Sequence, residues 1–204
     1  MGDTGRRFAE VFHGEPGRGA YLSRLFAFFS EEVVRQWAAC PEAPYSEAGR
    51  PVVWDADGQR FHALDFTLVD RETGGRYVAE LKCEIEFQNY AYLELVSPEV
   101  VRHHETGAAF QKLLQLAEDP GCLRVTIGGE EQRIDGAILV WGAMTVDGRR
   151  ATIHHYRFAD VLSIEEMLEE LADWRPEAWA QWVDRRRRWT DDLFEFLRYP
   201  PAPE

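Results

Sequence analysis

Cysteines and long apolar runs are both scarce in this chain. Its three cysteines, Cys40, Cys83 and Cys122, are far apart and form no CxxC pair, which excludes a disulfide framework. No stretch approaches the roughly 18 uninterrupted apolar residues of a membrane-spanning helix, and the first residues, MGDTGRR, lack the apolar segment of a secretory signal. We therefore expect a cytoplasmic protein with no membrane partner.

Several common nucleotide and hydrolase motifs are also absent. The sequence contains no P-loop, no G-x-G-x-x-G turn and no G-x-S-x-G elbow. Nucleotide hydrolysis, dinucleotide redox chemistry and serine-hydrolase chemistry therefore have no support from the sequence.

Positive charge is in short supply. There are 23 basic and 36 acidic residues, which gives a formal net charge of −13 and a pI near 4.9. Such a surface repels phosphate backbones at long range and excludes a free-standing, nonspecific nucleic-acid coat protein. Lysine is rarer still, because only Lys82 and Lys112 are lysines and all other basic residues are arginines.

What is present suffices for a folded core. Of the 204 residues, 45% are hydrophobic and 13% aromatic, which predicts one domain of ordinary to large size. The order of the predicted elements indicates an α/β protein whose central mixed sheet, an antiparallel meander plus further strands, is covered by helices on both faces. We divide it into an N-terminal extension (1–19), a core (20–158) and a helical C-terminal extension packed on the same domain (159–204).

The hydrophobic period sets the predicted elements. Apolar residues at helical spacing predict helices at 20–39, 98–104, 107–118, 163–174 and 176–197. Alternation with a period of two predicts strands at 52–54, 60–70, 76–87, 123–127, 133–141 and around 151–158. Ser163 with Glu166 three residues on is a capping box, and Pro176 opens the last helix.

Two of these strands carry side chains suited to chemistry. Strands 60–70 and 76–87 are joined by a short turn, and a turn centred near 72–73 sets Asp65 opposite Glu80, with Lys82 on the same face. Facing carboxylates repel when both are ionised, so a divalent cation between them would be stabilising. Mg²⁺ takes carboxylate oxygens and waters, and an adjacent lysine can hold a water or stabilise charge on a phosphate.

This arrangement resembles the PD-(D/E)XK nuclease superfamily. The resemblance rests on Asp65, a 14-residue gap and then Glu80-Leu81-Lys82 on a hairpin after a helix. The restriction-endonuclease-like core of that superfamily runs helix, three-stranded meander, helix, strand, and this order covers residues 20–141. Leu64 stands where the superfamily signature has proline.

The resemblance implies a metal-dependent nuclease acting on DNA. Asp65, Glu80 and the backbone carbonyl of Leu81 would ligate Mg²⁺, or Mn²⁺ as a substitute. Lys82 would position the attacking water, and the cut would leave a 5′-phosphate. Small nucleases of this kind often pair, so we expect a possible homodimer, or a partner protein that compensates for weak binding of DNA.

Members of the superfamily often supply a further acidic residue from the first helix. Here the candidates are Glu31 and Glu32. Glu32 lies at the edge of the stripe formed by Leu25, Phe29 and Val33, whereas Glu31 points nearly opposite. We therefore predict Glu32 as a metal ligand.

The identity of Lys82 favours the nuclease interpretation. A basic position in this chain is almost always arginine, yet lysine stands where the chemistry asks for it. The ammonium is a compact charge that can lose its proton when buried, and a guanidinium practically cannot.

Two other interpretations stay open. The fold could have lost turnover and serve as an interaction or assembly module. Alternatively, Glu80 and Lys82 could belong to a solvated sheet face with cross-strand ion pairs, in a plain α/β protein whose acidic face binds a partner.

Further substrate contacts are weaker candidates. Gln88, four residues before Tyr92, is similar to the Q-x-x-x-Y element of exonuclease-like members, and Gln111 and Lys112 on the second predicted helix are rival phosphate contacts. The run 185–188, four arginines followed by Trp189, could contact phosphates and a base, or form a solvated helix face with its neighbouring aspartates.

Overall fold

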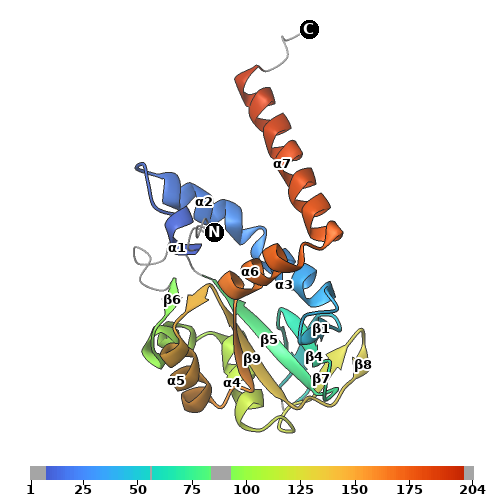
Figure 1. The fold of residues 1–204 in the computed structure, drawn as a ribbon. Helices are drawn as coiled ribbons and strands as arrows, with labels where there is room; N and C mark the ends of the chain where they lie inside the picture. The colour runs from blue at the N-terminus through green and yellow to red at the C-terminus, as the bar shows by residue number, and fades with distance from the viewer. Residues whose placement is uncertain (1–7, 56, 84–92, 200–204) are drawn as a thin grey trace.

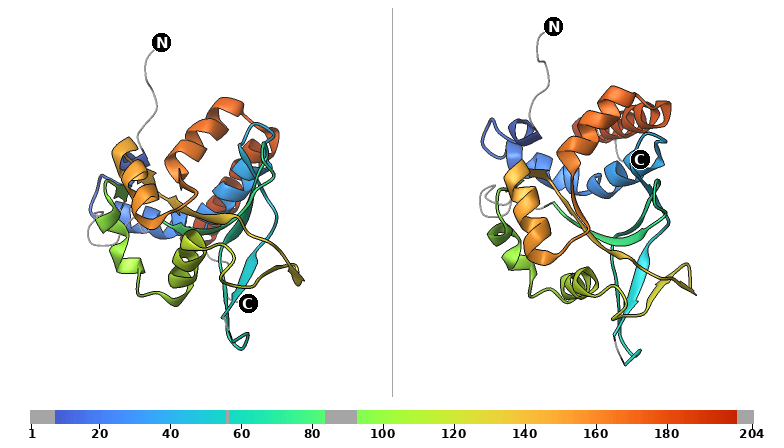
Figure 2. Two further views of the ribbon diagram at one scale, coloured as in Figure 1. Left: turned by 90° about the horizontal axis from the view of Figure 1, so that it is seen from below. Right: turned by 60° about the horizontal axis from the view of Figure 1, so that its bottom comes forward.

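A computed structural model describes residues 8–55, 57–83 and 93–199. The chain is a mixed α/β protein with a curled five-stranded sheet (Figures 1 and 2). The helices in the described residues are α1 (Phe8–Val11), α2 (Arg18–Ala27), α3 (Ser30–Ala39), the 3₁₀ helix η1 (Pro98–His104), α4 (Ala108–Glu118), α5 (Val146–Tyr156), α6 (Ile164–Trp174) and α7 (Glu177–Arg198). Among them, no helix is both long and apolar enough to cross a bilayer.

In the described residues, the strands fall into three sheets. Their bounds are β1 (Tyr45–Glu47), β2 (Pro51–Trp54), β3 (Phe61–Ala63), β4 (Phe66–Asp70), β5 (Arg76–Lys82), β6 (Glu94–Leu95), β7 (Val125–Ile127), β8 (Glu130–Glu131), β9 (Gly136–Trp141), β10 (Ala143–Met144) and β11 (Asp160–Ser163). The central sheet has the order β1-β4-β5-β9-β11, antiparallel as far as β5 and parallel beyond it. The order β3-β2-β7-β8 forms an antiparallel sheet, and β10 pairs with β6.

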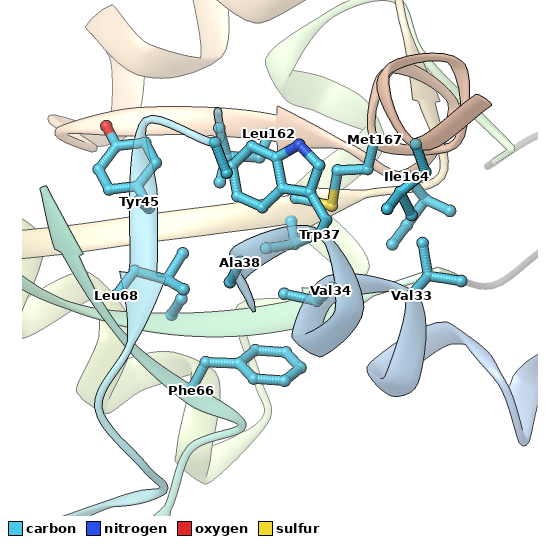
Figure 3. Packing of buried hydrophobic residues seen from close by; sticks show 14 of the residues in the cluster. Val33, Val34, Trp37, Ala38, Tyr45, Phe66, Leu68, Leu162, Ile164 and Met167 are labelled. Atoms are coloured by element: carbon cyan, nitrogen blue, oxygen red, sulfur yellow. The ribbon is translucent and has the colours of Figure 1, made fainter. Parts of the chain in front are cut away.

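Helices cover both faces of the central sheet, as the sequence predicts (Figure 1). On one face, Trp37 of α3 and Met167 of α6 join the same buried cluster as Leu68 of β4 (Figure 3). On the other face, Phe110 of α4 packs in a second cluster that contains Leu139 of β9. The buried apolar area of both clusters holds the strands in place, and β9 is buried along its whole length.

The strand predicted at 60–70 is wrong in one respect, because it is two strands in different sheets. The backbone N–H of Leu64 donates to the carbonyl of Pro51 in β2, whereas the N–H of Asp65 donates to the carbonyl of Ala79 in β5. Consequently Leu64 is buried in the cluster of α4, while Phe66 lies in the cluster of α3. The alternating pattern continues through the crossing, so sequence periodicity alone does not reveal it.

The single helix predicted at 20–39 is also divided. α2 ends at Ala27 and α3 begins at Ser30, with Phe28 exposed and Phe29 in edge-to-face contact with Trp182. Tertiary packing at the junction outweighs local helix propensity here. The division matters for the site because it changes which side chains of α3 face the sheet.

The strand predicted around 151–158 is wrong, because those residues belong to α5. The hydroxyl of Thr145 accepts a hydrogen bond from the backbone N–H of Gly148 at 2.9 Å, which caps the helix start. Arg157, with φ of 59°, ends it. Apolar and polar residues alternate between Ala151 and Phe158 much as they do in a strand. The N-cap residue Thr145 is the sequence feature that indicates a helix here instead.

The terminal segments contribute to the fold unequally. Phe8 and Phe12, which lie before residue 20, are buried in the cluster of α3. β11 begins just after residue 158 and pairs with β9, so the central sheet extends past the sequence-based boundary. The predicted helix start at Ser163 is confirmed, since its hydroxyl accepts from the N–H of Glu166, which is one of the two hydrogen bonds of a capping box. In contrast, α7 has no buried residue and projects from the body (Figure 1).

Candidate functional site

Asp65 and Glu80 face each other where the chain crosses between sheets. The predicted register is confirmed over β4, where Phe66 pairs with Ala79, and just past the end of that ladder Asp65 and Glu80 line the same pocket. One carboxylate oxygen of Asp65, Oδ2, accepts a hydrogen bond from the backbone N–H of Leu81 at 2.8 Å. The side chain is therefore held at the end of β4 by the neighbouring strand.

Lys82 completes the group on the same face of β5. Its Nζ lies 2.8 Å from Oε1 of Glu80, and alternation along the strand brings the two side chains together. Glu80 is only 5% exposed, whereas the Lys82 side chain is 24% exposed. An exposed arginine, Arg50, approaches Asp65 with 3.6 Å between Nη2 and Oδ1, and solvent weakens that pair.

Burial disfavours the ionised form of both carboxyl groups. The pKa of Glu80 is raised by burial and by the charge of Asp65, and Lys82 offsets part of this. Burial likewise raises the pKa of Asp65, where the N–H of Leu81 and the charge of Lys82 act in the opposite direction and Glu31 adds to the increase. The site therefore carries an excess of negative charge that its own lysine does not cancel.

One oxygen of this pair has no partner among the described residues. Oε2 of Glu80 is buried and receives no hydrogen bond, which is costly for a carboxylate. The pair opens into a pocket of about 290 Å³ that is lined by Ser30, Glu31, Asp65, Glu80, Leu81, Lys82 and Cys83. Burial raises the pKa of the Cys83 thiol to about 12, so at neutral pH a thiolate nucleophile is excluded here.

The structure brings Glu31, and not Glu32, to this pocket. The buried face of α3 contains Ser30, Val33 and Val34. At about 100° per residue, Glu31 lies at the flank of that face and Glu32 nearly opposite. Glu32 instead accepts a hydrogen bond from the amide of Gln36 at 2.8 Å. The expectation for Glu32 assumed an unbroken helix, and the break before Ser30 changes the phase.

The other predicted contacts do not gather at the pocket. Gln88 lies outside the described residues. Gln111 is exposed on α4, and neither it nor Lys112 lines the pocket. Nζ of Lys112 lies 2.6 Å from Oδ1 of Asp55, so this lysine forms an ion pair elsewhere.

The sequence indicates the arginine run 185–188 as a phosphate contact, but it does not reveal that Arg186 lines a second pocket next to the first. This second pocket is lined by Glu31, which both pockets share, by Glu32 and Arg35, and by Trp182 and Arg186 of α7. The guanidinium of Arg186 lies 5.2 Å from the Trp182 ring centroid and 4.5 Å from that of Trp189. The Nε1 of Trp182 is buried without a hydrogen-bond partner in the described part of the chain. The helical spacing of Trp182, Arg186 and Trp189 is the sequence feature that indicates this arrangement.

The donor set suits a hard divalent cation better than zinc. No cluster of three or more His, Cys, Asp or Glu side chains able to hold a metal occurs in the described ranges. Mg²⁺ needs only one or two protein carboxylates and keeps several waters, whereas structural zinc needs four protein ligands. Asp65 and Glu80, whose Oε2 has no hydrogen-bond partner among the described residues, supply the two carboxylates that Mg²⁺ needs.

Comparison with known proteins adds nothing to what the geometry of the site shows. Neither a family model, nor a curated protein sequence, nor a solved structure matches this chain.

Proposed function

We propose that the protein is a Mg²⁺-dependent DNA nuclease with a restriction-endonuclease-like core of the PD-(D/E)XK type. The observation that carries the proposal is the group formed by Asp65, Glu80 and Lys82. The buried carboxyl group of Glu80 lies beside the partly buried one of Asp65, with a lysine 2.8 Å from Glu80, in a pocket at the end of the central strand β5. A fold stabilised only by packing has no reason to bury such a pair, because each charge loses hydration.

The residues fit the cation that the proposal requires. Asp65 and Glu80 would hold it, with the backbone carbonyl of Leu81 as a third ligand and Glu31 close enough to line the same pocket. The unpartnered Oε2 of Glu80 would then gain a partner. When bound, Mg²⁺ supplies a Lewis acid that neutralises charge on the phosphate.

The chain's own groups account for the rest of the proposed reaction. Lys82 orients a water for in-line attack on phosphorus and stabilises the negative charge that develops. A new P–O bond forms with the water oxygen and the bond to the 3′ oxygen breaks, leaving a 5′-phosphate and a 3′-hydroxyl. Glu80 fixes the ammonium through its 2.8 Å contact, while the N–H of Leu81 fixes Asp65.

The second pocket supports an approach path for the DNA strand. Glu31 joins it to the carboxylates, and the guanidinium of Arg186 is a donor suited to phosphate oxygens. An overall charge of −13 confines binding to such local positive sites.

A cleavage assay tests the proposal with a matched control. Purified protein is incubated with plasmid and single-stranded DNA in Mg²⁺ or Mn²⁺, beside Asp65→Ala, Lys82→Ala and Lys112→Ala. We expect Asp65→Ala and Lys82→Ala each to lose at least about 100-fold in rate, and Lys112→Ala, which removes the only other lysine, to stay near wild type. Equal behaviour of all four proteins would refute catalysis at this site.

The alternative is a nuclease-like fold that serves as an interaction module. The net charge of −13 favours it, since such a surface binds DNA poorly. Calorimetry with Mn²⁺ separates the two alternatives from a plain acidic face. Heat without cleavage identifies a metal-holding but inactive fold, and absence of heat eliminates the metal site.

A further inference from the structure

The outer part of α7 carries a large apolar surface without a partner among the described residues. Trp189, Leu193, Phe196 and Leu197 are each more than half exposed. They lie after the turns through which Trp182 contacts Phe29, where the helix has left the body (Figure 1).

These four side chains form one stripe along the helix. Their spacing of four, seven and eight residues from Trp189 places them on one face, and the charged residues that follow Arg186 occupy the rest of the circumference. Phe194 lies off the stripe, where its ring contacts Tyr21 of α2 with 6.5 Å between centroids. The stripe is therefore the face that α7 presents to a partner.

The stripe is comparable to the largest apolar patch of a typical monomer. Large aromatic side chains offer about 150–250 Å² each, so the four half-exposed stripe residues together expose on the order of 400 Å². The largest patch of a typical monomer is about 300–600 Å² and is often functional, whereas each side of a stable dimer buries about 800 Å². The stripe would form the apolar centre of a dimer interface, and its polar flanks would supply the remaining area.

Charge distinguishes between the possible partners. α7 contains five arginines and five acidic residues, so it is neutral and the net charge of −13 resides on the remainder of the chain. Two copies therefore repel each other everywhere except along this helix. A membrane is a poorer partner, because helices that lie on anionic lipid carry a cationic polar face and the lipid repels an acidic protein.

We infer that the Trp189–Leu193–Phe196–Leu197 stripe packs against the same stripe of a second copy, in a homodimer with two-fold symmetry. The same patch on both subunits then forms the interface. The inference does not depend on the nuclease proposal, since it concerns a surface away from the carboxylate pocket.

Sedimentation velocity from about 1 to about 100 µM, the range around a micromolar dissociation constant, tests the inference. We expect a dimer whose dissociation constant rises at least about tenfold with Leu193→Asp, Leu193→Ala or Phe196→Asp, because each removes apolar area from both subunits. Val146→Asp is the matched control: Val146 is 82% exposed on α5 and its replacement leaves the dimer unchanged.

Three results would overturn the inference. They are a wild-type protein that stays monomeric at the highest concentration, a dimer that all three stripe variants leave intact, and a monomer that sediments with anionic vesicles. The replaced side chains are exposed, so the monomer stays folded, and circular dichroism verifies this. Leu193→Ala keeps a strong helix former at the position, so a loss of dimer there reflects the lost contact.

Discussion

At the scale of single residues, Glu80 shows the conflict between stability and chemistry. Its carboxyl group is buried, faces Asp65 and has one oxygen without a hydrogen bond in the described residues. Lys82 neutralises only one charge of the pair. Sites organised for reaction often retain such unfavourable contacts, and removing them stabilises the fold while function is lost.

Glu80→Gln therefore makes the metal-free protein more stable at neutral pH. Glutamate in an unfolded chain titrates near about 4.3, and the folded pKa is raised. Between the unfolded and the folded pKa of Glu80, the folded state binds a proton that the unfolded state has lost. Protonation of Glu80 therefore stabilises the fold fully below the unfolded pKa, and this stabilisation is lost as pH rises through the folded pKa. We expect a gain of up to about 1 kcal/mol in the free energy of unfolding at pH 7, shrinking toward pH 4.

Urea unfolding of both proteins across this pH range measures the difference. Glu131→Gln, which changes an exposed carboxylate on β8, is the control and leaves the pH profile unchanged. Added Mn²⁺ reverses the order, because a cation that binds the folded state stabilises wild type more than the variant. A variant no more stable than wild type at pH 7 would contradict the proposed repulsion.

At the scale of elements, the register of β4 and β5 was predictable and the phase of α3 was not. A short turn and a period of two determine which residues face each other, so Asp65 and Glu80 follow from local sequence. The side of α3 that faces the sheet depends on the break at Phe28 and on the packing of Phe29 against α7. That contact spans most of the chain, and no local pattern contains it.

The two adjacent glutamates of α3 provide a test of this phase. Glu31→Gln removes a charge from the pocket, and we expect Mn²⁺ affinity to fall by about tenfold. Glu32→Gln removes the same charge one residue away, on the side where the carboxylate bonds to Gln36, and changes the affinity less than twofold. Calorimetric titration of both variants gives the comparison. The reverse order of effects would restore Glu32 as the acidic residue of the site.

At the scale of the whole molecule, the scarcity of positive charge limits how the proposed nuclease would bind DNA. Acidic residues outnumber basic ones by 13, so long-range attraction to a phosphate backbone is absent. Arg186 is instead held between two indole rings beside the pocket. The fold gathers a few positive groups where a strand would pass and leaves the remainder of the surface acidic.

The number of phosphate contacts is therefore small, and the salt dependence of binding measures it. In the Lys82→Ala background, which removes cleavage, the affinity for a fluorescent single-stranded oligonucleotide is followed by anisotropy as salt increases. Each neutralised phosphate of a single strand contributes about −0.7 to the slope of log affinity against log salt, so one to three contacts give about −0.7 to −2. Arg186→Gln reduces the slope by about 0.7. Arg133→Gln, at a side chain 91% exposed and remote from the pocket, leaves it unchanged. If the slope of log affinity against log salt is steep and is the same for Arg186→Gln and Arg133→Gln, the DNA binds to another surface.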